Sequence, residues 1–142
     1  MDVLWGVLDG YAPLTSWLTA RGGKKWKFTA GDRLPLELTP TDLPALMVWL
    51  TKVESHWHST AQFATAATFA VEMRTDSRDE REALDLAWNV WQALVGQRAT
   101  NFGLTNLLDW RMEGGPLERA FEKGKDAAVW KMRVGVTLVV VE

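Results

Sequence analysis

The sequence predicts one α+β domain, residues 1–142, in which two main helices pack on one side of a largely antiparallel or mixed β-sheet. Three observations lead to this prediction. Two stretches show the three- and four-residue apolar spacing of helices, and several others alternate or run apolar as strands do. The resulting order of helix, arm, strand, strand, helix, strand, strand is typical of an α+β fold. A chain of 142 residues is also long enough to bury its own core.

The first helix is predicted near the start of the chain, where apolar residues from Val3 to Leu18 recur on one helical face. Pro13 interrupts this segment, because an interior proline lacks a backbone donor and clashes with the preceding turn. We therefore expect a kink or two short helices, which end at Arg21-Gly22-Gly23.

An extended arm or loop is predicted at about residues 22–42. Glycine and proline recur there and up to Pro44, among charged and hydroxyl residues, and this density of breakers opposes long regular elements. Within the arm, residues 25–29 and 36–38 are candidates for short strands.

Two paired strands follow the arm. The first, from Ala45 to about His58, begins solidly apolar, which indicates a strand buried on both faces at its start. The second alternates between residues 63 and 74, with Glu72 and Arg74 on the face opposite its apolar side chains. We expect a hairpin around Ser59-Thr60 to join the two strands.

A second helix is predicted from the capping box at Ser77-Arg78-Asp79-Glu80, where serine and glutamate each satisfy an unpaired backbone donor. Its apolar stripe runs from Ala83 to Leu94 and includes Trp88 and Trp91. Gly96 is a plausible stop for this helix.

The last part of the chain is predicted to return to the sheet. Residues 104–112 are expected to form a strand, residues 117–123 one or two helical turns, and residues 129–142 a strongly apolar terminal strand. A terminal strand of this composition belongs inside a sheet.

Composition narrows the function classes. The formal net charge is −2 with a pI near 5.7, which argues against nonspecific binding to nucleic acid or an anionic membrane. The chain has no cysteine, so disulfides, thiolate metal sites and cysteine nucleophiles are excluded. The start of the chain does not resemble a signal peptide, and its apolar runs have strand length, so we expect neither secretion nor membrane insertion.

No motif indicates catalysis, a cofactor or a metal. His56 and His58 could share one strand face, but metal sites need three or four ligands, so two exposed histidines are the preferred interpretation. Gly22 to Lys25 lacks the spacing of a phosphate loop. Acidic residues from Asp76 to Asp85 suit the positive end of a helix dipole. We therefore predict a protein that is not an enzyme.

Nine tryptophans are the main anomaly of the composition, since tryptophan is enriched at protein interfaces. Trp17, Trp88 and Trp91 fall on apolar helical faces, so we assign them to the core. Tryptophans and lysines among polar neighbours are interface candidates, and sugar stacking by exposed tryptophan is a third, weaker interpretation. The interface candidates are Lys24, Lys25, Trp26, Lys27, Trp57 and Trp110.

An ordered series of motifs gives a family resemblance. A proline-led apolar strand, Leu43 to Thr51, precedes a second strand, Phe69 to Met73, and a helix that begins near Asp79 with acidic residues. Trp130 then precedes a last strand, Val134 to Glu142. This series resembles the tail terminator family of long-tailed bacteriophages, most closely the lambda type. The resemblance covers roughly residues 1–20 and 43–142, and the arm departs from it.

The resemblance implies a structural protein of the virion tail, at its neck end, assembled in the host cytoplasm. Its members form a ring, commonly a hexamer, that caps the tail-tube protein, stops its polymerisation and offers a surface to the head-tail connector or neck protein. DNA would pass through the lumen without specific binding. The alternatives are another neck, tail-completion or tail-tube-like subunit, and a small metal- or sugar-binding protein using His56, His58 and surface tryptophans.

Overall fold

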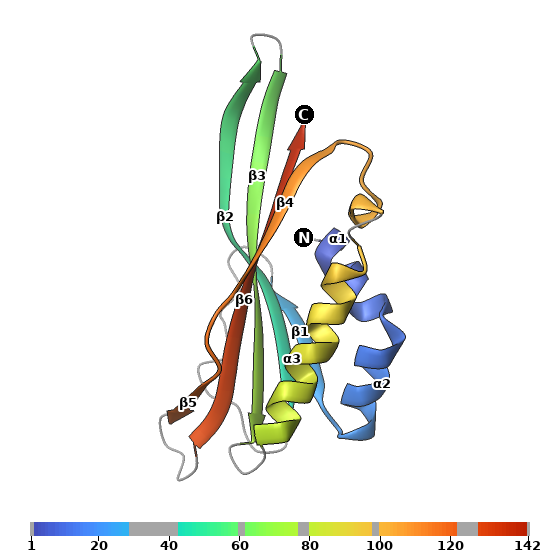
Figure 1. The fold of residues 1–142 in the computed structure, drawn as a ribbon, viewed down its shortest axis with the longest axis vertical. Coiled ribbons are helices and arrows are strands. Elements are labelled where there is room, and N and C mark those ends of the chain that lie inside the picture. Colours follow the sequence, from blue (N-terminus) through green and yellow to red (C-terminus); the bar gives the residue numbers. More distant parts are fainter. Residues whose placement is uncertain are drawn as a thin grey trace.

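A computed structural model describes residues 2–28, 43–59, 62–76, 80–97, 100–121 and 128–141 (Figure 1). Helices and strands follow one another in an order close to the predicted one. The elements are α1 (Asp2–Gly10), α2 (Ala12–Ala20), β1 (Lys24–Phe28), β2 (Ala45–Ser59), β3 (Gln62–Asp76), α3 (Glu80–Val95), the 3-10 helix η2 (Asn101–Gly103), β4 (Leu107–Gly114), β5 (Glu118–Phe121) and β6 (Ala128–Val141).

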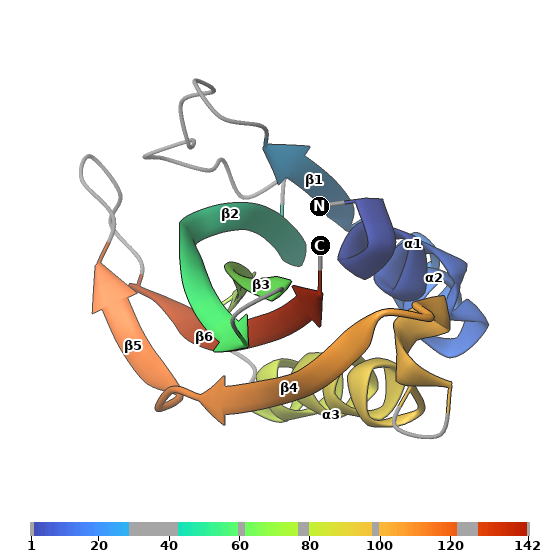
Figure 2. The same ribbon diagram turned by 90° about the horizontal axis from the view of Figure 1, so that it is seen from above.

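The strands form one six-stranded mixed sheet, which confirms the predicted α+β class. The strand order is β1-β2-β3-β6-β4. β5 pairs with residues Ala128–Lys131 of β6, on the same edge of β6 as β4. Only the β1–β2 pair is parallel among the described pairs, and the other pairs are antiparallel. The long strands β2, β3 and β6 form the strongly twisted centre of the sheet (Figures 1 and 2).

Pro13 divides the first helical segment into α1 and α2, as predicted. The proline stands in the first turn of α2, where its missing N–H leaves no intrahelical bond unmade. Gly22 has a φ of 66°, a left-handed conformation that glycine adopts without a steric penalty, and the chain turns there into β1. The three α-helices among the described residues thus correspond to the two predicted helical segments, with the first segment divided at Pro13.

The hairpin strands lie where the sequence places them. β2 and β3 pair from Ala45–Arg74 to Ser59–Gln62, with irregularities between Leu50 and Lys52 and near the tip. The first short strand of the arm is confirmed as β1. Thr60 of the turn, the second short strand at residues 36–38 and Ser77 to Asp79 of the capping box lie outside the described residues.

The core lies between the helices and one face of the sheet (Figure 1). The helices contribute leucines at four-residue and similar spacings, and the sheet contributes β-branched and aromatic side chains. Each fully buried apolar side chain of this size stabilises the fold by about 1.5–3 kcal/mol. The core includes Leu4, Leu8, Leu14, Leu18, Leu86, Val90 and Leu94 from the helices and Leu46, Val48, Phe69, Val71 and Val136 from the strands.

The prediction of helical turns at residues 117–123 is wrong over its described part. Glu118–Phe121 forms β5, which pairs in antiparallel register with Ala128–Lys131 of β6. The backbone hydrogen bonds that β6 offers along its open edge decide this conformation, because local sequence preference is weak over four residues.

No helix in the described ranges has the length and apolar character needed to cross a membrane.

Candidate functional site

Helix α3 is apolar on two flanks. Leu86 and Val90 point into the core and are fully buried. Leu84, Trp88 and Trp91 follow one another at four- and three-residue steps on the opposite flank, with 51%, 63% and 45% of their surface exposed. The assignment of Trp88 and Trp91 to the core is therefore wrong. The apolar stripe of α3 is wider than the surface that the sheet and the other helices cover.

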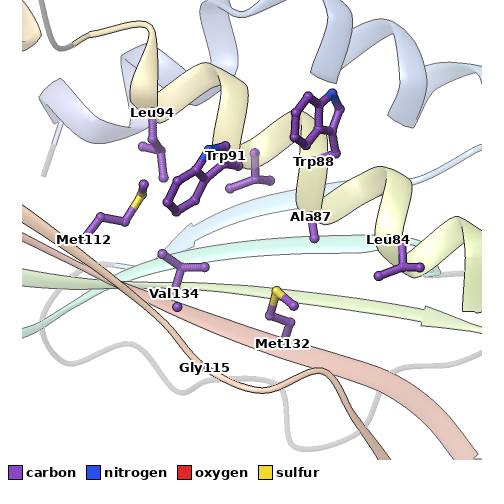
Figure 3. A pocket seen from close by; sticks show the side chains of 11 residues that line it. Leu84, Ala87, Trp88, Trp91, Leu94, Met112, Gly115, Met132 and Val134 are labelled. Atoms are coloured by element: carbon purple, nitrogen blue, oxygen red, sulfur yellow. The ribbon is translucent and has the colours of Figure 1, made fainter.

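A groove lies between this exposed flank and the sheet (Figure 3). Met132 and Val134 of β6 and Met112 of β4 form its apolar floor, and α3 forms its wall. Its volume is about 380 Å³. Methionine and tryptophan side chains suit such a surface, because both offer large apolar area and methionine adapts its shape to a partner.

Gly115 closes the groove at the end of β4. Its N–H donates to the carbonyl oxygen of Arg133 at 2.8 Å, and a Cβ added to Gly115 would lie 2.7 Å from the same oxygen. Only a residue without a side chain permits this close approach of the chain to β6. By contrast, a Cβ added to the neighbouring Gly114 would have no contact within 4 Å.

A second hollow of about 260 Å³ adjoins the groove, and Trp91 and Met112 line both. Trp110 and Val95 complete it. Trp110 is half buried, with its ring edge-to-face against Phe102 at a centroid distance of 5.1 Å. One predicted interface candidate, Trp110, thus borders the surface that carries the exposed tryptophans.

The other interface candidates lie elsewhere in the sheet. Lys24, Lys25, Trp26 and Lys27 belong to β1, which is at the far end of the strand order from β4. Lys24 is exposed, and Lys25 forms an ion pair with Asp9 of α1.

Trp57 lies near the end of β2. The side chains of Trp57, Trp26 and Lys27, and those of His56 and His58, lie outside the described residues. Over the described part of the chain, no group of three or more acidic or histidine side chains is placed to hold a metal ion. The interface candidates therefore remain predictions, and their backbone positions lie on three different strands, β1, β2 and β4.

The sheet face away from the helices contains a buried charge cluster that the sequence pattern missed. Glu72 is 1% exposed, and one of its carboxylate oxygens accepts from Arg74 Nε at 2.8 Å. The other oxygen accepts from Arg133 Nη2, also at 2.8 Å. The Arg133 guanidinium stacks on Trp49 at 4.9 Å. Strand alternation placed Glu72 on a polar face, but pairing with Arg133 depends on the β3–β6 register, which alternation does not reveal.

Both carboxylate oxygens of Glu72 are engaged by guanidinium groups, so we interpret the cluster as structural. A buried carboxylate of this kind needs charged partners to offset its lost hydration. The groove beside α3 is the candidate site of function, because the large apolar side chains of Leu84, Trp88 and Trp91 are exposed along it.

Comparison with known proteins identifies a solved structure with a similar fold. No protein-family model and no curated protein sequence matches this chain. Among solved structures, it is similar to a chain of the "Virion of native gene transfer agent (GTA) particle", with a TM-score of 0.56 and 15% sequence identity. The match covers 98% of this chain and 92% of that chain. This chain thus shares, over nearly its whole length, the fold of a component of that virion.

Proposed function

We propose that this chain is a structural subunit of a tailed-phage-like virion, and within that class a tail terminator. Copies of the chain form a ring that caps the tail tube, ends tube polymerisation and presents a joining surface to the head. The fold that it shares with a chain of a gene transfer agent virion supports the broader class. The motif series from Leu43 to Glu142 supports the narrower one.

The exposed line of Leu84, Trp88 and Trp91 beside an apolar groove is the observation that carries the proposal. Single exposed apolar residues are ordinary on a protein surface, but two exposed tryptophans flanking a methionine-lined groove mark an interaction site. Burying them against another subunit removes the cost of their contact with water.

Ring formation fixes the number of copies at the end of the tube. A head-to-tail contact that closes on itself gives a ring, whereas one that does not close gives a filament. A closed ring has a fixed number of copies and two unlike faces, and it ends a tube when one face matches the tube and the other does not match a further tube subunit.

Light scattering after size exclusion, together with electron microscopy of the purified protein, tests assembly. We expect closed rings of several copies. Trp88→Ala should reduce the ring fraction, whereas Val53→Ser, which changes another exposed apolar residue outside the groove, should leave it unchanged. A chain that stays monomeric at high concentration would contradict the proposal.

A capping assay separates a terminator from the related subunits. Tail-tube protein from the same particle is polymerised with and without this chain, and tube lengths are measured by electron microscopy. A terminator should shorten the tubes and appear once, at their ends. Incorporation along the tube would instead identify a tube-like subunit, and absence from the tubes would indicate another neck protein.

A further inference from the structure

The sheet has two open edges that lie on opposite sides of the molecule. β1 pairs only with β2, and β4 pairs only with β6, among the strands that the structure describes. Figure 2 shows β1 on one side and β4, β5 and α3 together on the other. An open strand edge presents unpaired backbone donors and acceptors, which another strand can complete.

The two sides carry complementary charge. Residues 10–28, which include α2 and β1, contain the cations Arg21, Lys24, Lys25 and Lys27 and no acidic residue. The side formed by α3, β4 and β5 has more acidic than basic residues among the exposed side chains that the structure describes there. Its exposed charged residues are the acids Glu80, Asp85, Asp109, Glu113 and Glu118 and the bases Arg81 and Arg111.

The register places the opposed charges on the same face of the sheet. Lys24 pairs with Ala45, and Ala45 pairs with Arg74, on the face away from the helices. On β4, Trp110 and Met112 pack on the helix face, so Asp109, Arg111 and Glu113 point to the opposite face. An edge contact between β1 of one copy and β4 of another therefore brings a lysine to a row of two carboxylates and one guanidinium, whose net charge is negative.

Strand direction also favours this contact. Following the pairings across the sheet, β4 runs antiparallel to β1. Copies related by rotation about an axis along the strands keep their strand directions, so β1 of one copy meets β4 of the next as an antiparallel pair. Antiparallel pairing is the more stable kind.

We infer that neighbouring copies of this chain join head to tail, with the β1 edge of one copy added to the β4 edge of the next, beside the α3 groove. The occupant of the α3 and β4 side is thus a second copy of this chain, through its segment Arg21–Phe28. This inference rests on the proposed ring and specifies which two surfaces meet in it. A contact between two different surfaces is what ring closure requires.

Engineered disulfides test the contact directly, because the natural chain has no cysteine. One protein carries Lys24→Cys. Three others each carry a cysteine at an exposed β4 position, Asp109, Arg111 or Glu113. Proteins are oxidised singly and in mixtures, and Ser55→Cys, an exposed position on β2 beyond the segment Ala45–Trp49 that pairs with β1, replaces Lys24→Cys as the matched control. The natural chain is measured by light scattering in parallel.

We expect a linked dimer when Lys24→Cys is mixed with one of the β4 variants, and none from either protein alone or from the Ser55→Cys mixtures. If rings form but the Lys24→Cys variant makes no disulfide with any β4 variant, the inference is overturned and the proposed function still stands. Efficient linking of a β4 variant to itself would show a two-fold contact and overturn the inference. A natural chain that is monomeric throughout would overturn both.

Discussion

At the residue scale, Glu72 shows how a charged side chain is accommodated inside this sheet. Its carboxylate lies between Arg74 on its own strand and Arg133 on the neighbouring strand. Arg74 is itself buried, whereas the Arg133 side chain is 56% exposed and keeps much of its contact with water. The cost of breaking the cluster therefore depends on which residue is removed.

Glu72→Ala is expected to lower the free energy of unfolding by about 3–5 kcal/mol, because it removes the buried carboxylate that pairs with both the Arg74 and the Arg133 guanidinium groups. Arg133→Met should cost less, since Arg74 still pairs with Glu72 and Arg133 is largely hydrated. Urea unfolding at a concentration that keeps the protein monomeric measures both. Equal losses for the two variants would show that Arg74 does not depend on Glu72.

Gly115 and Gly114 form a matched pair for testing the turn after β4. Gly115→Ala places a methyl group against the Arg133 carbonyl and is expected to cost about 1–3 kcal/mol through overpacking. Gly114→Ala meets open space and should change stability by less than about 0.5 kcal/mol. Thermal unfolding of the two variants provides the comparison, and similar melting temperatures would contradict the close approach at Gly115.

At the element scale, one apolar flank of α3 belongs to the core and the other lines the groove. One flank packs Leu86, Val90 and Leu94 against the sheet and the other helices. The other flank presents Leu84, Trp88 and Trp91 to the groove. The acidic residues in the first turn, Glu80 and Glu82, suit the positive end of the helix dipole and have no need of a catalytic explanation.

The same substitution, leucine to alanine, at Leu86 and at Leu84 of α3 tests the two flanks separately. Leu86→Ala removes a fully buried side chain and is expected to lower the free energy of unfolding by about 2–5 kcal/mol. Leu84→Ala should leave the stability of the single subunit within about 0.5 kcal/mol and weaken assembly instead. Chemical unfolding and light scattering on both variants measure the two effects; a large stability loss for Leu84→Ala would mean that this flank is part of the core.

At the scale of the whole molecule, one mixed sheet ends in two unlike edges, and its apolar groove opens beside one of them. This asymmetry is what a head-to-tail assembly uses, because each copy offers one surface of each kind to its two neighbours. A two-fold dimer would use one surface twice and would leave the other edge open.

Trp88→Ala is expected to weaken subunit association by about tenfold or more, since a central interface tryptophan typically contributes about 2 kcal/mol or more. Sedimentation at a series of concentrations gives the association constant. Val53→Ser is the control, because Val53 is exposed to a similar extent and does not line the groove. Equal weakening by both variants would place the interface elsewhere.

The sequence by itself determined the local elements. Apolar spacing located the helices, Pro13 divided the first of them, and alternation located the strands that became β2, β3 and β6. These features depend on interactions between residues that are close in the chain, and such interactions can be predicted from apolar periodicity and from backbone chemistry. The lambda-type resemblance and the interface role of Trp110 came from the same patterns and remain to be tested.

The tertiary structure alone decided which surfaces face solvent. Trp88 and Val90 belong to the same predicted apolar stripe, but only the packing of the sheet shows that one is exposed and the other buried. Similarly, only the β3–β6 register brings Arg133 to Glu72, and only the open edge of β6 makes a strand of Glu118–Phe121. These outcomes depend on contacts between residues far apart in the chain, and a single sequence carries no local signal for them.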